Sequence, residues 1–129
     1  MMIDNGFGAT FKVAIGLPST VQDDFKRAMV DSVRLTYPHL SLDEETEIPH
    51  GNRYVRPDLI VRLPGTETVV LVADAKCRGK IELRDVMKMV KYKATMRASR
   101  AALYHPANAH VTAGARQAAG LNDVDLVAA

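Results

Sequence analysis

The chain carries two apolar segments, Arg56-Pro57-Asp58-Leu59-Ile60-Val61 and Val69-Val70-Leu71-Val72-Ala73-Asp74-Ala75-Lys76, each with an aspartate at one end. The first lies in a predicted strand over residues 53–63 and the second in a predicted strand over 68–77, with a turn at 64–67. The second segment is continuously apolar instead of alternating, which is typical of a central strand covered on both faces. The two segments therefore predict a sheet with helices on both sides.

Other segments show helical or extended spacing. Six further elements are expected: helices over residues 19–35, 83–100 and 111–119, and strands over 42–48, 101–104 and 124–127. Residues 49–52 are expected to form a turn. Up to the strand at 101–104, the order is helix, strand, strand, strand, helix, strand. It predicts an α/β (α+β) fold with a mixed central sheet flanked by helices.

The composition is that of an ordinary globular protein. The 129 residues are 47% hydrophobic and 25% charged, and this length predicts one domain over residues 1–129. No stretch approaches the ~20 apolar residues of a membrane span, and the amino terminus does not resemble a secretory signal. We therefore expect a cytoplasmic protein without a membrane partner. Cys77 is the only cysteine, which excludes an intrachain disulfide framework and a multi-cysteine metal site.

Positive charge is concentrated in one part of the chain. Residues 76–100 contain 9 Lys and Arg against 2 Asp and Glu, although the net charge of the whole chain is only +2. Such density suits a surface that contacts the phosphates of a nucleic acid, and it suits a solvated helix face equally well. The candidate basic contacts are Arg78, Lys80, Arg84, Lys88 and Lys91.

The two aspartates make a geometric prediction. Asp58 stands opposite Asp74 in a hairpin if paired residue numbers sum to 132, in which case Leu63 meets Val69 and the loop has an odd number of residues, three or five. Directly opposite Cβ atoms lie ~4.5–5.5 Å apart, so both carboxylates could share a magnesium ion. Lys76, two residues beyond Asp74, lies on the same face. Alternatively, the two carboxylates cap turns or pair with arginines.

The pattern Pro57-Asp58 … Asp74-Ala75-Lys76 resembles the signature of the PD-(D/E)xK nucleases, which have a restriction-endonuclease-like fold. The resemblance implies a Mg²⁺-dependent deoxyribonuclease, with Mn²⁺ able to substitute. Asp58, Asp74 and the carbonyl of Ala75 would hold the metal, and Lys76 would orient or deprotonate the attacking water.

The next helix and strand extend the resemblance. The segments Asp85–Tyr92 and Ala101–Pro106 are similar to those that follow the metal site in nuclease subunits of McrBC-type restriction systems. In this similarity, Lys88 contacts the phosphate as a further catalytic residue and Tyr92 packs beside it in the nucleic-acid-binding surface. The alternative is a solvated lysine next to a half-buried tyrosine.

The family often supplies a third acid, a glutamate, from its first helix, and this chain has no glutamate there. Asp31 is the first candidate for this metal ligand, followed by Asp24 on the same side of the helix and by Glu47. Asp23 is expected to point elsewhere.

The expected function is hydrolysis of phosphodiester bonds in DNA, either with selectivity for DNA structure or as part of a restriction or defence system. The active form is expected to be a homodimer or a subunit of a larger complex. One alternative is a non-catalytic nucleic-acid-binding or assembly domain that keeps this fold, and another is a nuclease that acts on RNA. The sequence leaves open the preferred DNA structure and the choice between endonuclease and exonuclease.

Overall fold

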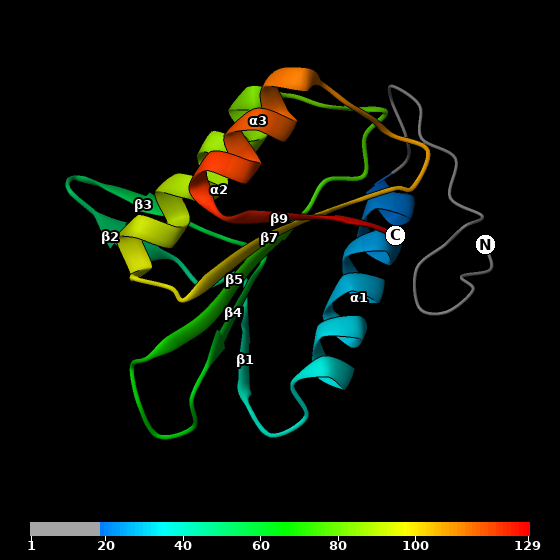
Figure 1. Cartoon of the computed structure of the whole chain (residues 1–129). Helices are drawn as coiled ribbons and strands as arrows, with labels where there is room; N and C mark the ends of the chain where they lie inside the picture. Colours follow the sequence, from blue (N-terminus) through cyan, green and yellow to red (C-terminus); the bar gives the residue numbers. More distant parts are fainter. Residues whose placement is uncertain (1–18) are drawn as a thin grey trace.

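A computed structural model describes residues 19–129, which form a five-stranded mixed sheet between one helix on one face and two on the other (Figure 1). The helices are α1 (Ser19–Thr36), α2 (Leu83–Met96) and α3 (Ala113–Asn122). The central strands, in spatial order, are β1 (Ser41–Glu44), β4 (Leu59–Arg62), β5 (Val69–Ala75), β7 (Arg100–His105) and β9 (Val124–Ala128). The predicted fold class is confirmed, and the helices and central strands follow the predicted order, including α3 and β9, which correspond to the helix expected over 111–119 and the strand expected over 124–127.

The central strand β5 joins two kinds of pairing. It pairs antiparallel with β4 and parallel with β7, so the sheet is antiparallel on the β1 side and parallel on the β9 side. Two short ladders lie outside this sheet, one between β2 (Ile48–His50) and β3 (Arg53–Val55), the other between β6 (Lys80–Ile81) and β8 (His110–Val111). No helix in the described residues is long and apolar enough to cross a membrane.

Alternation along β4 and β5 divides the core between the two faces. Leu59, Val61, Leu71 and Ala73 pack against α1, in a cluster with Met29, Val30 and Val33. Even-numbered side chains such as Ile60 and Val72 pack against α2 and α3. Both faces of β5 are therefore covered, as its continuous apolar sequence predicts.

Four predicted segments are shorter than expected. The strand predicted over residues 42–48 ends at Glu44, as β1. The strand predicted over residues 53–63 is divided into β3 and β4, with Pro57 between them. Proline has no N–H to donate to a neighbouring strand, which favours a break at this position. The turn predicted over 49–52 is reduced to Gly51 and Asn52, because Pro49 and His50 pair with β3. The helix predicted over 83–100 ends at Met96, where Arg97 takes a left-handed conformation with φ of 50°.

The hairpin between β4 and β5 has the predicted register near the site but not near its loop. Leu59 pairs with Ala73 and Val61 with Leu71, so each pair sums to 132. A β-bulge then shifts the register, and the Leu63 N–H donates to the Thr68 carbonyl at 3.1 Å. The loop is therefore Pro64–Glu67, four residues long. The predicted odd-numbered loop is wrong because the bulge absorbs one residue of β5.

Candidate functional site

Asp58 and Asp74 meet where β4 begins and β5 ends. The Asp58 N–H donates to Asp74 Oδ1 at 2.7 Å, and the Ala75 N–H donates to Asp58 Oδ2 at 2.9 Å. Each carboxylate thus accepts a hydrogen bond from the backbone of the other strand. This exchange fixes both side chains at one corner of the sheet, as the predicted register requires.

Asp74 is the buried member of this pair, with 2% of its surface exposed. Burial, followed by the nearby charge of Asp58, raises the pKa of Asp74 from 3.8 to about 6, although the hydrogen bond from the Asp58 backbone and the charges of Lys76 and Lys88 act in the opposite direction. A buried carboxylate of this kind needs a cation or several hydrogen-bond donors close by.

Two lysines supply positive charge to Asp74 from different elements. Lys76 Nζ, just beyond β5, lies 3.9 Å from Asp74 Oδ2, and Lys88 Nζ, on α2, lies 4.0 Å from the same oxygen. Burial lowers the pKa of Lys76. Burial acts in the same direction on Lys88, but the charge of Asp74 and the contact with Tyr92 outweigh it, and the pKa of Lys88 is raised. The structure brings both predicted lysines to the site.

Tyr92 lies one helical turn after Lys88, and the Lys88 ammonium lies over its ring. The Lys88 ammonium is 5.6 Å from the centre of the Tyr92 ring, within the range of a cation–π contact. The side chain of Tyr92 is buried. In this conformation its ring faces Lys88 and is not exposed at the surface.

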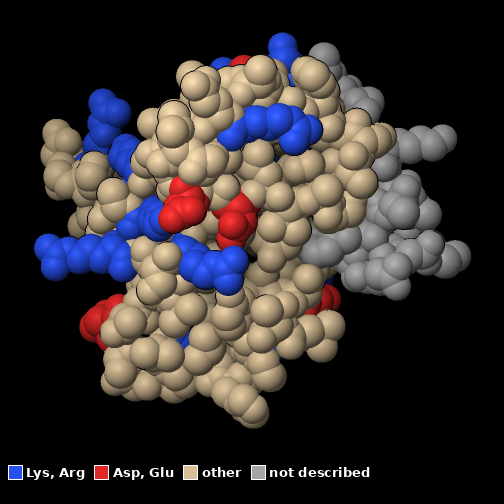
Figure 2. Space-filling view, viewed as in Figure 1, with Lys and Arg blue, Asp and Glu red and all other residues tan. Residues whose placement is uncertain are grey.

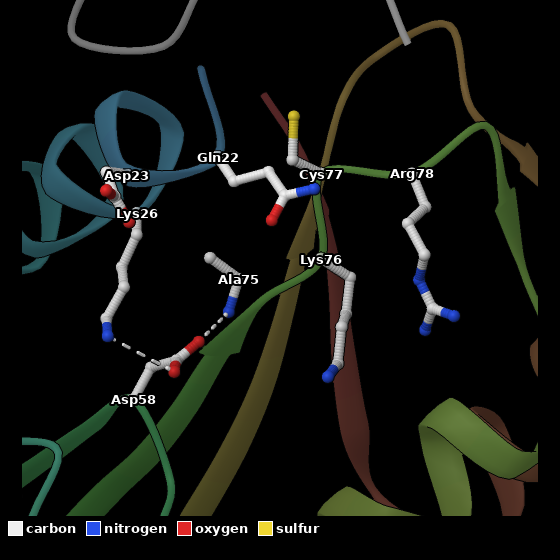
Figure 3. A pocket seen from close by; sticks show the side chains of 8 residues that line it. All are labelled: Gln22, Asp23, Lys26, Asp58, Ala75, Lys76, Cys77 and Arg78. Atoms are coloured by element: carbon white, nitrogen blue, oxygen red, sulfur yellow. Dashed lines mark hydrogen bonds and ion pairs between the residues drawn. The ribbon is translucent and has the colours of Figure 1, made fainter. Parts of the chain in front are cut away.

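A pocket of about 300 Å³ opens beside Asp58, between the first turns of α1 and the end of β5 (Figure 3). It is lined by Gln22, Asp23, Lys26, Asp58, Ala75, Lys76, Cys77 and Arg78. Asp23 therefore reaches the pocket, contrary to the prediction that it points elsewhere. Lys26 Nζ lies 3.5 Å from Asp58 Oδ1 and 2.5 Å from Glu45 Oε1. Sequence reasoning missed Lys26, because no local pattern links a residue of α1 to Asp58.

The structure does not bring the predicted third acids to this pocket. Asp31 is exposed and lies eight residues beyond Asp23, which is about 12 Å along the helix axis. Asp24 lines a neighbouring pocket of about 330 Å³, together with Glu44 and Glu45. Glu47 is exposed. Within residues 19–129, no group of three or more His, Cys, Asp or Glu side chains is arranged to hold a metal.

The donor set nevertheless fits a magnesium ion. Mg²⁺ in phosphate-processing sites is commonly held by one or two carboxylates and keeps several waters, with substrate phosphate completing its coordination. Asp58 and Asp74 provide the two carboxylates, and Ala75 lines the same pocket. Each carboxylate uses one oxygen for its backbone hydrogen bond, which leaves further lone pairs for a cation.

The predicted basic contacts differ in how far they are neutralised. Arg78 lines the pocket and forms an ion pair with the buried Asp85, and Arg84 pairs with Glu82 at 3.4 Å. Lys80 and Lys91 are exposed. On the face shown in Figure 2, acidic and basic side chains lie next to one another near the centre. Most of the rest of that face is formed by other residues, drawn in tan. That face is not a continuous basic surface.

No protein-family model matches the chain, and no curated protein matches it in sequence. Two solved structures have a similar fold. A protein of unknown function designated AF1548 shares 12% identity, with a TM-score of 0.58 over 76% of this chain and 53% of that one. EndoMS in complex with double-stranded DNA shares 17% identity, with a TM-score of 0.53 over 93% of this chain and 48% of that one. The chain thus spans about half the length of each, and similarity at this identity shows the fold alone.

Proposed function

We propose that this protein is a metal-dependent nuclease of the PD-(D/E)xK type, which hydrolyses phosphodiester bonds in DNA. The observation that carries the proposal is the pair Asp58 and Asp74, whose carboxylates exchange backbone hydrogen bonds across a hairpin while two lysines face the buried one. A buried carboxylate with a pKa raised to about 6, beside two ammonium groups, is typical of a functional site.

Asp58, Asp74 and the carbonyl of Ala75 are the proposed holders of the metal. A bound Mg²⁺, or Mn²⁺ in its place, supplies Lewis-acid polarisation of the scissile phosphate and a lowered pKa of the attacking water. The carboxylates contribute preorganisation, because their backbone hydrogen bonds fix them before the metal arrives.

The two lysines have different proposed tasks. Lys76 is mostly buried and its pKa is lowered, which suits an amine that orients the water or accepts its proton. Lys88 is about half exposed and its pKa is raised, so it keeps its charge and can offset the negative charge of the phosphate.

DNA is the proposed substrate class. Support comes from the bound DNA in the structure of EndoMS, which has a similar fold, and from the basic residues between positions 76 and 100. We propose that selectivity comes from a second copy or from another subunit, as in the McrBC-type systems that the α2 sequence resembles.

The second candidate is a non-catalytic nucleic-acid-binding or assembly domain. It is favoured by the ion pair of Lys26 with Asp58, on the side where an acid from the first helix is expected, and by the lack of any group of three or more metal-ligating side chains within the described residues. Under this reading, Asp58 and Asp74 serve only to join β4 to β5.

The test compares cleavage of supercoiled plasmid, branched DNA, single-stranded DNA and RNA in Mg²⁺ and in Mn²⁺. Wild type is expected to cut at least one DNA substrate, whereas Asp74→Ala and Asp58→Ala are expected to be inactive. Asp31→Asn is the matched control and should retain full activity, because Asp31 is exposed away from the pocket. If Asp74→Ala and wild type behave alike on every substrate, the nuclease proposal is wrong. Activity confined to RNA would replace the substrate class.

A further inference from the structure

Lys26 joins two carboxylates that come from different parts of the chain. Its ammonium lies 2.5 Å from Glu45 Oε1 and 3.5 Å from Asp58 Oδ1 (the latter contact is drawn in Figure 3). The Lys26 side chain is only 22% exposed. Burial lowers the pKa of Lys26, but the contacts with Glu45 and Asp58 outweigh burial and raise it. Lys26 is therefore a positive charge held beside Asp58 in the lining of the pocket.

Glu45 is held beside Asp58 by the backbone. Its N–H donates to the Asp58 carbonyl at 3.1 Å, immediately after β1 ends at Glu44. Glu45 also has a φ of 51°, a left-handed conformation that residues other than glycine adopt rarely and at a cost. The turn therefore holds the backbone of Glu45 beside Asp58, where Lys26 contacts both carboxylates.

We propose that Lys26 is a positioning residue that occupies the cation position beside Asp58 in the metal-free site, and that Glu45 takes over its charge when a divalent cation binds. The inference rests on the proposed metal site. An ammonium and a divalent cation repel each other across a few ångströms, so both cannot be held by the same carboxylate oxygen without cost. Because Lys26 is already closer to Glu45, release of Asp58 requires only that the longer contact opens.

The proposal predicts opposite effects for the two partners. Lys26→Met removes the competing charge, so Mn²⁺ binds about fivefold more tightly, which is the lower end of the usual coupling between interacting sites. Glu45→Gln leaves Lys26 with Asp58 as its carboxylate partner, so Mn²⁺ binds about fivefold more weakly. Because Glu45 acts through Lys26, the double variant should bind Mn²⁺ like Lys26→Met alone. A general loss of surface charge would instead give additive effects.

The experiment is titration of the metal-stripped full chain with MnCl₂ by isothermal calorimetry, with free Mn²⁺ followed by electron paramagnetic resonance. The chain offers a matched control, since Arg27 and Glu44 form a neighbouring ion pair between the same two segments at 3.1 Å. Arg27→Met and Glu44→Gln should leave Mn²⁺ affinity within twofold of wild type. Lys26→Gln repeats the test with a polar side chain, and circular dichroism verifies that each variant is folded.

Three results would overturn the inference. Lys26 variants that bind Mn²⁺ no better than wild type would show that no competition exists at Asp58. A double variant that resembles Glu45→Gln would show that Glu45 acts without Lys26. If wild type binds no Mn²⁺, the metal site itself is wrong and the inference fails with it. If wild type binds and Asp58→Asn does not, the metal site stands and a negative result concerns Lys26 alone.

Discussion

Asp74→Asn should stabilise the metal-free protein at pH 8, although the same change abolishes the proposed activity. Asp74 is 2% exposed, and burial followed by the charge of Asp58 raises its pKa from 3.8 to about 6. The folded-state pKa therefore lies above the ordinary value. The folded state therefore favours the protonated carboxyl of Asp74. The stability of wild type is unaffected by this burial below about pH 4, and part of it is lost as the pH rises through 6 and Asp74 ionises in the folded state.

The size of this effect follows from the pKa. One pKa unit corresponds to about 1.4 kcal/mol, so a rise from 3.8 to about 6 makes the ionised site unfavourable by at most about 3 kcal/mol at pH 8. Asparagine stays neutral at every pH, and its side-chain oxygen can still accept the Asp58 N–H that Asp74 Oδ1 accepts at 2.7 Å.

Urea denaturation in EDTA, at pH 4.5 and at pH 8, measures the effect. The free energy of unfolding of Asp74→Asn should exceed that of wild type at pH 8, and the difference should shrink towards pH 4.5. Asp125→Asn is the control, because Asp125 lies on β9 and is exposed, so its charge is not buried as that of Asp74 is. An Asp74→Asn variant that is equally or less stable than wild type at pH 8 would refute the reasoning, because the buried charge would then be fully compensated in the metal-free site.

Four other predictions concern separate parts of the molecule. Lys88→Met should lower the single-turnover cleavage rate about 100-fold with little change in stability, because Lys88 is half exposed and acts on the developing charge; an unchanged rate would remove it from the site. Mg²⁺ should raise the melting temperature of wild type in a thermal melt but not that of Asp58→Asn, and an equal rise in both would place the metal elsewhere. Arg97→Gly should increase the free energy of unfolding in urea by about 0.5–1 kcal/mol, because glycine takes the left-handed conformation without strain; a decrease would contradict this. Leu103→Ala should decrease it by about 2–5 kcal/mol, since Leu103 is fully buried under α2, and a loss below 1 kcal/mol would show that the core collapses around the gap.

The sequence predicts the sheet and the two aspartates well because both depend on short-range patterns. The continuous apolar stretch of β5 identifies a central strand, and period-2 geometry then places Asp58 opposite Asp74. The spacing of four residues between Lys88 and Tyr92 likewise predicts one helix face.

The remainder of the site depends on contacts that no local pattern encodes. Lys26, Glu45 and Asp58 come from a helix, a turn and a strand, and they meet only because α1 crosses the sheet with its first turns beside the end of β5. The same placement explains why Asp23 lines the pocket while Asp31 lies two turns away. The helical repeat predicts which residues share one face of α1, but it does not predict which turn of the helix lies next to the site.

The bulge in β5 could not be predicted from the sequence either, for a different reason. Val69, Val70 and Leu71 are all apolar, so inserting one residue into the strand changes no visible alternation.

That bulge separates the two ends of the β4–β5 hairpin. The bulge lies between the loop Pro64–Glu67 and the pair Asp58 and Asp74. At this position β5 can gain or lose one residue without changing which face the residues on the Asp74 side occupy. Single-residue insertions and deletions in the loop can therefore be absorbed as the bulge forms or disappears. The length of this loop is free to vary among descendants of the sequence, while the spacing of the two aspartates in the ladder stays unchanged.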